Sequence, residues 1–335
     1  MKYTVGSLFA GIGGICYGFR QAGFEIKWAN EWDKHACKTY RHNFKHHLEE
    51  GDINLIKNPK KDLGYVDVVT SGFPCQAFSV AGYRKGFKDP RGNLFFETAR
   101  FIDDIKPKAF LLENVKNMVT HDNHNTMRVI ENTITKELNY SFIPFILNAK
   151  DYGNIPQTRE RIYIVGFKGE GDQVRTLNDD NELNMYVDPE SKTGRFKIPS
   201  PLKMKKSIHD VLVSGKVDDK FYYDKTKYHD QLKREMKNPD TIYQWRRVYC
   251  RENKSNVCPT LTANMGTGGH NVPLILTKGG IRKLIPEECV GFQGFPKGFK
   301  FPKDMNNSHC YKQAGNSVVV PVIKRIATRL KVCLD

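Results

Sequence analysis

Short apolar runs alternate with amphipathic segments along the first half of the chain. The runs at 4–9, 24–29 and 65–70 have the length and composition of buried strands. Glycines or polar turn residues follow each run, and the segment at 94–105 has the spacing of a helix with one apolar face. Further strands are predicted at 109–112, 142–147 and 162–167, and further helices ending near 21, running from 33 towards 44, and at 123–138. Alternating strands and helices predict an α/β fold built on a doubly wound sheet.

The second half of the chain lacks this regularity. From 168 to about 265, polar runs and basic, proline-containing runs interrupt the apolar positions. Aromatic and arginine residues are interleaved between 222 and 251, a mixture that suits phosphate contacts and base stacking or packing. Two interpretations follow, a nucleic-acid surface or a loosely structured insertion. The apolar segment 318–330 is predicted to close the chain as a helix.

The charge balance is strongly basic. The formal net charge is +16 at pH 7 and the sequence pI is about 9.4, with lysine and arginine spread over the whole length. Such a balance favours a polyanionic partner, nucleic acid first and an acidic membrane surface second, while a merely solvated basic surface is the alternative. No run approaches the roughly 18 apolar residues of a membrane span, and glycines interrupt the apolar start of the chain. We therefore expect a cytoplasmic protein without a membrane segment.

The sequence contains no metal-binding pattern. The eight cysteines include no CxxC pair, so they predict neither a zinc ribbon nor a thioredoxin-like site, and reduced thiols are the simplest interpretation. The histidines at 35, 42, 46 and 47 have no acidic or thiol partner at ligand spacing. We interpret these histidines as solvated and expect no metal site.

Cys75 follows the strand at 65–70, in the stretch Ser71-Gly72-Phe73-Pro74-Cys75-Gln76. The turn residues Gly72 and Pro74 place this cysteine where the strand ends. In open parallel sheets the ligand crevice lies at the carboxyl ends of the strands. A lone cysteine is most often a small buried hydrophobe, but this position makes Cys75 a candidate nucleophile.

A second strand end carries a nucleotide-binding pattern. The strand at 4–9 runs into Ala10-Gly11-Ile12-Gly13-Gly14, a glycine turn where a backbone can approach a nucleotide closely. Cys16 stands where the dinucleotide fingerprint has its third glycine, which argues against a nicotinamide cofactor. Glu31 lies about twenty residues after the glycines, where a carboxylate can hold ribose hydroxyls. The turn at 51–53 can place a carboxylate beside an adenine amino group.

Charged residues follow two later strands. Glu113 comes directly after the strand at 109–112, and burial beside apolar residues disfavours an unpaired carboxylate. Its pKa is therefore expected to rise, so that it can deliver a proton near neutral pH. Arg159 and Arg161 alternate in an extended segment, and we predict that both point to the same face of it.

Eight motifs, in order, relate the chain to a known family. They are Phe9-Ala10-Gly11-Ile12-Gly13-Gly14, Asn30-Glu31-Trp32, Gly51-Asp52-Ile53, Gly72-Phe73-Pro74-Cys75-Gln76, Glu113-Asn114-Val115, Gln157-Thr158-Arg159-Glu160-Arg161, Arg282-Lys283-Leu284 through Gly294-Phe295-Pro296, and Gln313-Ala314-Gly315-Asn316-Ser317. With these motifs the chain resembles the DNA cytosine-5 methyltransferases, in the short form of bacterial restriction–modification enzymes, over nearly its whole length. Family members that act on transfer RNA carry a second proline where this chain has Phe73, so the resemblance favours DNA.

The resemblance implies a two-domain architecture. A catalytic and cofactor-binding domain, with the Rossmann-like fold of S-adenosylmethionine-dependent methyltransferases, would comprise residues 1–183 and 305–335. A smaller target-recognition domain would comprise residues 184–304. One chain then holds both halves of the cleft, so we expect a monomer that acts on double-stranded DNA. A companion restriction endonuclease is compatible with the resemblance but leaves no trace in this sequence.

The resemblance also implies a covalent mechanism on a cytosine that has been flipped out of the duplex. The Cys75 thiolate would attack carbon 6 of the base, after which carbon 5 would take the methyl group. Glu113 would bond or protonate N3, and Arg161 would polarise the O2 carbonyl. Arg159 would lie beside the nucleophile loop.

Binding residues follow from the same resemblance. Trp32 would pack on the adenine of S-adenosylmethionine, and Glu31 would hold the ribose hydroxyls. The residues expected to bind this cofactor are Phe9, Gly11, Gly13, Glu31, Trp32, Asp52, Ile53, Pro74, Asn316 and Ser317. The residues expected to bind DNA are Gln76, Ser79, Arg91, Arg246, Arg247, Thr260 and Asn264. Of these, Thr260 matches a Thr-Leu pair of the family's recognition domain, whereas Arg246, Arg247 and Asn264 lie in the stretch 243–269, where we expect base contacts.

Two other functions stand as alternatives. A protein of this fold could bind DNA without turnover, but the joint presence of Cys75, Glu113 and Arg161 argues against that. A nicotinamide dehydrogenase on a similar sheet is opposed by the missing third glycine and by the Phe-Pro-Cys loop. The DNA sequence that is read depends on side chains outside the shared motifs.

Overall fold

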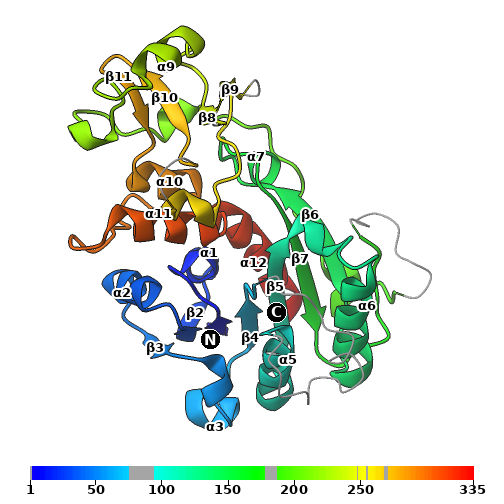
Figure 1. The fold of residues 1–335 in the computed structure, drawn as a ribbon. Helices are drawn as coiled ribbons and strands as arrows, with labels where there is room; N and C mark the ends of the chain where they lie inside the picture. Colours follow the sequence, from blue (N-terminus) through cyan, green and yellow to red (C-terminus); the bar gives the residue numbers. More distant parts are fainter. Residues whose placement is uncertain (1, 75–93, 178–186, 247, 254–255, 268–270) are drawn as a thin grey trace.

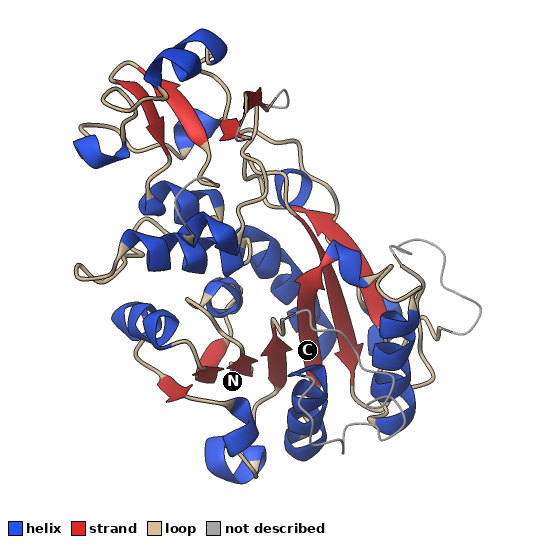
Figure 2. Cartoon of the chain, in the orientation of Figure 1, coloured by secondary structure: helices blue, strands red, loops and turns tan. Residues whose placement is uncertain are grey.

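The apolar runs of the first half pair into one seven-stranded sheet with helices on both faces (Figure 1 and Figure 2). The computed structural model describes residues 2–74, 94–177, 187–246, 248–253, 256–267 and 271–335. The strands of this sheet are β1 (Thr4–Leu8), β2 (Glu25–Glu31), β3 (His47–Glu50), β4 (Val68–Ser71), β5 (Ala109–Val115), β6 (Ile143–Asn148) and β7 (Glu160–Phe167).

The strand order is β3-β2-β1-β4-β5-β7-β6, and all neighbours are parallel except β7, which is antiparallel to β5 and β6. The predicted α/β class with a doubly wound sheet is confirmed, with one strand reversed. The first five strands follow the order of a dinucleotide-binding sheet, but the insertion of β7 between β5 and β6 departs from that order. The winding changes direction between β1 and β4, so a ligand crevice is expected at the carboxyl ends of these strands.

Helices cover the two faces of this sheet over separate cores. The α-helices of the described residues, of which α9 packs on a smaller sheet, are α1 (Gly14–Gln21), α2 (Lys34–Asn43), α3 (Pro59–Leu63), α5 (Leu94–Ile105), α6 (Asn125–Asn132), α7 (Ala149–Tyr152), α8 (Lys192–Arg195), α9 (His229–Glu235), α10 (Pro286–Phe292), α11 (Asn307–Asn316) and α12 (Val320–Leu334). Leu111 of β5 enters the core under α1 and α12, whereas its neighbour Phe110 enters the core under α5 and α6. This alternation follows from the period of two in a strand. Within the described ranges, every helix is too short or too polar to span a lipid bilayer.

Three elements of the large sheet and its helices differ from the sequence predictions. Strand β5 continues through Val115 instead of ending at 112, because its last residues stay paired with β7. The helix expected at 123–138 ends its α-helical part at Asn132 and continues as a π-helical turn. The sequence pattern does not predict β3, because its residues are polar or charged and their order comes from pairing with β2.

The irregular second half contains a smaller antiparallel sheet in the order β11-β10-β8-β9, set apart from the main sheet (Figure 1). Its strands are β8 (Tyr243–Trp245), β9 (Cys250–Glu252), β10 (Leu274–Thr277) and β11 (Gly280–Lys283). Leu232 of α9 packs with Tyr243 and Leu274 in a core of its own. The interpretation as a loosely structured insertion is therefore wrong for the described residues. The domain boundaries at 183/184 and 304/305 stay a prediction.

A buried ion pair joins the smaller sheet to the helices beneath it. Arg282 of β11 donates to both carboxylate oxygens of Glu288 in α10, at 2.7 and 2.6 Å, and both side chains are almost fully buried. Glu288 also accepts hydrogen bonds from the backbone N–H groups of Ile285 and Val213. Such a pair orients one element on another, because removing either partner would leave a charge buried and unpaired.

Candidate active site

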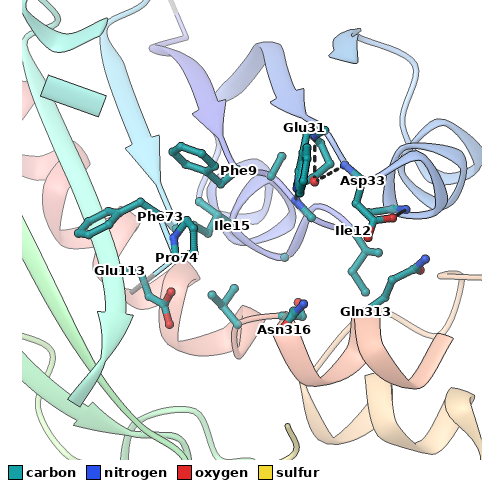
Figure 3. A pocket seen from close by; sticks show the side chains of 18 of the residues that line it. Phe9, Ile12, Ile15, Glu31, Asp33, Phe73, Pro74, Glu113, Gln313 and Asn316 are labelled. Atoms are coloured by element: carbon teal, nitrogen blue, oxygen red, sulfur yellow. Dashed lines mark hydrogen bonds between the residues drawn. The ribbon is translucent and has the colours of Figure 1, made fainter. Parts of the chain in front are cut away.

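A cavity of about 710 Å³ opens at the carboxyl ends of the parallel strands (Figure 3). It is lined by the ends of β1 to β5, the loops that follow these strands, and the end of α11. Figure 3 shows Glu113 and Pro74 toward one end of the cavity and Glu31 and Asp33 toward the other. The cavity lies where the strand order predicts a ligand crevice, and its volume is within the range of about 300–1,000 Å³ typical of small-molecule sites.

The glycine turn after β1 has the strained backbone of a close-approach loop. Phe9 and Gly11 have φ angles of 52° and 56°, and Gly13 has a φ of 85°. A side chain at position 13 would lie 2.2 Å from the ring of Phe44, so only glycine fits there. Phe9 and Gly11 line the cavity, whereas Gly13 does not. A side chain at Gly13 would thus meet α2, and the role of Gly13 in cofactor binding stays a prediction.

Glu31, at the end of β2, is held by backbone N–H groups. Its Oε2 accepts from Gly11 at 2.7 Å, and its Oε1 accepts from Trp32 at 3.0 Å and from Asp33 at 2.9 Å. Burial raises the pKa of the Glu31 carboxyl, although the three N–H donors favour its ionised form. The carboxylate is thus oriented before a ligand arrives, beside a Trp32 side chain that is 74% exposed.

The cavity brings together most of the residues predicted to bind a cofactor. The nine of them that line it are Phe9, Gly11, Glu31, Trp32, Asp52, Ile53, Pro74, Asn316 and Ser317. Sequence reasoning missed Asp33, Lys312 and Gln313, which also line the cavity. Nζ of Lys312 lies 2.9 Å from Oδ2 of Asp33, which joins α11 to the start of α2. Gln313 was within reach of sequence reasoning because it opens the last of the eight motifs.

Glu113 is a second buried acid, at the opposite end of the cavity from Glu31 (Figure 3). Only 9% of its surface is exposed, and its Oε1 lies 3.2 Å from Nε of Arg161. Strands β5 and β7 are antiparallel, and Glu113 is paired with Tyr163. Arg161 precedes Tyr163 by two residues on the same face of β7, so its side chain can reach Glu113. Burial raises the pKa of Glu113, and the charges of Arg161 and Arg159 oppose this only in part. The predicted upward shift is confirmed.

Arg159 lines the same cavity as Arg161, as the predicted shared face requires, but it binds different partners. Its guanidinium donates to the carbonyl oxygens of Leu261 at 2.6 Å, Gly315 at 3.1 Å and Ser317 at 2.5 Å. Burial, and then repulsion from Arg161, lower the pKa of Arg159 to about 9, so it stays charged at pH 7. Arg159 therefore joins three segments that are distant in the sequence.

Replacing Arg159 by lysine is expected to lower the free energy of unfolding by about 2 kcal/mol, because one ammonium group cannot reproduce three hydrogen bonds of about 1.5–3 kcal/mol each. Urea denaturation of the variant and the intact protein measures this loss. Arg128→Lys, at an exposed position of α6, is the matched control and should change stability by less than about 0.5 kcal/mol. Equal stability of all three proteins would show that the carbonyl contacts of Arg159 contribute little.

Asn114, to which the sequence assigned no role of its own, supports the turn that precedes Cys75 in the sequence. Its Nδ2 donates to the carbonyl oxygen of Phe73 at 2.9 Å, and its Oδ1 accepts from the N–H of Val115 at 2.8 Å. The end of β5 is thereby tied to the segment that carries Pro74. The candidate nucleophile and three predicted DNA contacts, Cys75, Gln76, Ser79 and Arg91, lie outside the described residues. Their roles stay predictions.

Three other predicted DNA contacts, Arg246, Thr260 and Asn264, are described and do not line the cavity. Arg246, directly after β8, and Asn264, in the short helical turn Ala263–Gly266, are exposed. Thr260 is half-buried, and its hydroxyl donates to the carbonyl oxygen of Thr158 at 2.5 Å. Arg247 lies outside the described residues. Arg246 and Asn264 are thus accessible to a ligand, while Thr260 has a structural bond of its own.

His46 is half-buried and has side-chain partners, whereas the sequence prediction has it solvated. Its Nε2 lies 2.6 Å from the hydroxyl oxygen of Tyr40, its ring also contacts Phe44, and burial lowers its pKa to about 4. The sequence pattern does not predict this contact with Tyr40, because the contact forms only where the chain folds back from α2 into β3. The histidines at 35, 42 and 47 are exposed. In the part of the chain that the structure describes, no three His, Cys, Asp or Glu side chains are grouped to hold a metal ion.

The chain is similar to known proteins over nearly its whole length. The profile of the C-5 cytosine-specific DNA methylase family matches residues 3–332. The Type II methyltransferase M.Bsp6I of Bacillus sp. (strain RFL6) is 54% identical over 332 residues, which cover 97% of this chain and 98% of the relative. The Type II methyltransferase M.SsoII of Shigella sonnei is 40% identical over 336 residues, which cover 100% of this chain and 81% of the relative.

A solved structure shares the fold. The crystal structure of the S. pombe Dnmt2 methyltransferase matches over 100% of both chains, with a TM-score of 0.72 and 19% sequence identity. At this level of identity the likeness concerns the fold alone.

Proposed function

The chain belongs to the C-5 cytosine-specific DNA methylases, and from this membership we propose that it transfers a methyl group from S-adenosylmethionine to carbon 5 of a flipped-out cytosine in a short sequence of duplex DNA. The observation that carries the proposal is that one cavity is lined by four of the predicted site residues, Glu113, Arg161, Glu31 and Trp32. Direct transfer needs the methyl donor and the base side by side, and a shared cavity supplies that proximity. Family membership also removes the nicotinamide dehydrogenase from the alternatives.

The side chains at the Glu31 end of the cavity fit S-adenosylmethionine. The oriented Glu31 carboxylate can accept hydrogen bonds from the ribose hydroxyls, and the exposed Trp32 indole can stack on the adenine. Asp52 is exposed, and among the described residues its carboxylate accepts hydrogen bonds from Asn54 alone, at Oδ1. Nothing lies within 4 Å of a side chain at position 11, so the backbone of Gly11 has open space in front of it. When bound, the cofactor supplies an electrophilic methyl group.

Four residues supply the chemistry on the base. The Cys75 thiolate adds to carbon 6 of cytosine, and the electron pair of the 5,6 double bond makes carbon 5 nucleophilic. The Glu113 carboxyl gives its proton to N3, which neutralises the charge that the addition places on the ring. Arg161, 3.2 Å from Glu113, donates to O2, and Arg159 positions the walls of the site. Carbon 5 takes the methyl group and then loses its proton to water. The electron pair of that C–H bond restores the 5,6 double bond as the Cys75 thiolate leaves carbon 6, and N3 returns its proton to the Glu113 carboxylate.

The cytosine has to leave the duplex to reach this site. Glu113 is almost fully buried, so a stacked base could not approach its carboxyl. Flipping a base costs a few kcal/mol, which contacts to the protein offset. Arg246 and Asn264 of the recognition region, both exposed, are placed to supply some of these contacts.

A role in DNA modification is supported by the relatives. M.Bsp6I and M.SsoII are named Type II methyltransferases. Methylation of one short sequence would mark DNA against a companion restriction endonuclease, which need not bind this chain. The contacts of Arg159 with Leu261 and Gly315 join both sides of the cleft within one chain, which supports action as a monomer.

The test of the proposed function is transfer of labelled methyl from S-adenosylmethionine to unmethylated genomic DNA, followed by bisulfite sequencing. Label on carbon 5 of cytosines within one short motif is the expected result, and the sequencing reads that motif directly. DNA binding without transfer would instead support the binding-only alternative. Transfer to transfer RNA but not to DNA would overturn the choice of substrate.

Trp32→Ala is expected to weaken binding of S-adenosylmethionine about tenfold to hundredfold, because stacking on a base is worth about 1–3 kcal/mol. Isothermal titration of the cofactor into the protein measures the change. Leu55→Ala is the matched control, since both side chains are 74% exposed but only Trp32 lines the cavity. Equal affinities of the two variants would show that the indole does not contact the cofactor.

A further inference from the structure

A strongly basic surface lies outside the cavity, where two segments distant in the sequence meet. The six charged residues between Lys192 and Lys206 are all cations, and α12 has four cations and no acid. Helix α12 contacts α8 and α7, behind the large sheet in Figure 1. The positive charge of the two segments is thus concentrated on one side of the molecule.

Arg325 of α12 holds these segments together. Its guanidinium donates to the carbonyl oxygen of Tyr152 at 2.9 Å and to that of Ser200 at 2.7 Å. The backbone N–H of Lys205 donates to Oδ1 of Asn154 at 2.7 Å, which lays the lysine-rich segment against the loop after α7. The cations of this segment and of α12 therefore share one surface.

The cations of this surface are not neutralised. Lys203, Lys205, Lys206 and Arg329 are exposed, and throughout the described ranges none of the four forms an ion pair. The next acid along the chain, Asp210, accepts hydrogen bonds from Ser207, and it attracts Lys206 without forming an ion pair with it.

Arg325 and Arg329 are one helical turn apart, an arrangement of like charges that destabilises a helix. Burial, and then repulsion from Arg329, lower the pKa of Arg325. Helix α12 keeps these two cations together although their repulsion destabilises it, and unpaired lysines lie next to them. Such an arrangement is suited to binding a polyanion. The surface is therefore more than a solvated face with balanced charge.

We propose that the α12 basic surface, consisting of Lys203, Lys205, Lys206, Arg325 and Arg329, binds the phosphate backbone of duplex DNA outside the target sequence. None of these residues lines the cavity, so the surface does not act on the reacting base. Phosphate contacts of this kind are independent of sequence and hold a protein on DNA while it searches for a target. This inference rests on the proposed function in one respect, which is that the partner is DNA.

The test compares two fourfold variants of the full chain, K203Q/K205Q/K206Q/R329Q and the control K2Q/K60Q/K61Q/K136Q. All eight positions are exposed, and each variant lowers the net charge from +16 by four. Binding to a duplex of about 200 base pairs without the target sequence is measured over a range of salt. The slope of log K against log salt should become shallower by about 0.9 for each phosphate that the variant no longer neutralises, and only in the first variant.

A second readout separates this surface from catalysis. On a duplex of about 20 base pairs with the target sequence, both variants should methylate at the rate of the intact protein. On plasmid-length DNA the first variant alone should be slower, by about threefold or more. Equal salt slopes for the two variants would overturn the proposal, as would a loss of binding to phosphatidylglycerol vesicles with unchanged DNA binding. Failure of the intact protein to methylate DNA would defeat the proposed function, whereas the comparison of slopes would stand on its own.

Discussion

Cys75→Ser is expected to abolish methyl transfer, with a fall in rate of at least roughly 10⁴-fold, the scale seen when an enzyme loses its nucleophile. A serine hydroxyl has a far higher pKa than a thiol and is not ionised near neutral pH, so addition to carbon 6 is lost. Without that addition, carbon 5 of cytosine is too poor a nucleophile to take the methyl group. Initial rates with labelled S-adenosylmethionine and genomic DNA measure the effect.

Two controls separate the chemistry of Cys75 from folding. Cys250→Ser, at the least buried of the seven described cysteines, should keep the intact rate. DNA with 5-fluorocytosine in the target sequence cannot lose a proton from carbon 5, so it should remain covalently bound to the intact protein and to the control, but not to Cys75→Ser. Methyl transfer by Cys75→Ser near the intact rate would contradict the covalent mechanism.

Glu113→Gln is expected to lower kcat by about 10²–10⁴-fold and to leave DNA affinity nearly unchanged, because an amide can still donate to N3 but cannot give up a proton. The buried position should accept glutamine, since the neutral amide has the shape of the carboxyl and no charge to desolvate. Glu160→Gln is the matched control on the neighbouring strand. Its carboxylate pairs with Lys116 at an exposed site, so this control should keep the intact rate within about twofold.

The pH dependence of kcat tests the role of Glu113 independently. Burial raises its pKa above the ordinary value of 4.5. In the proposed mechanism the protonated carboxyl is the form that donates to N3. Activity of the intact protein should therefore be highest below the raised pKa and fall as the pH increases through it. Glu113→Gln should lack this alkaline fall, because its amide does not titrate. The same fall in both proteins would assign the titration to another group.

The local sequence pattern was sufficient to predict the parts of the site that lie at the ends of strands. The glycine turn at 10–14, Glu31 and Glu113 each come at the end of an apolar run, and such runs mark strands without knowledge of distant contacts. Parallel strands place their carboxyl ends at one edge, so these positions converge on one cavity for a topological reason. The upward pKa shift of Glu113 was predictable for the same reason, since it needs only an apolar setting.

Contacts between segments that are distant in the sequence could not be predicted from the local sequence pattern. The alternation of Arg159 and Arg161 predicts a shared direction, but not that Arg161 meets Glu113 while Arg159 binds carbonyl groups 102 to 158 residues away. His46 is the opposite case, because its polar neighbours in the sequence predict solvent and the fold places it on Tyr40. Gly13 likewise belongs to the glycine turn by pattern, but only the fold shows that a side chain there would meet the ring of Phe44.

The sequence by itself determined the α/β class, the family and the residue types gathered at the strand ends, because side-chain period, turn chemistry and motif order are properties of neighbouring residues. Only the tertiary structure decided which of these residues line the cavity, how Arg159 joins β7 to the segments around Leu261 and Gly315, and where the cations of α12 meet the lysines near 205. The physical reason is that such contacts depend on loop closure and on the packing of side chains across layers, and neither leaves a periodic signal along the chain.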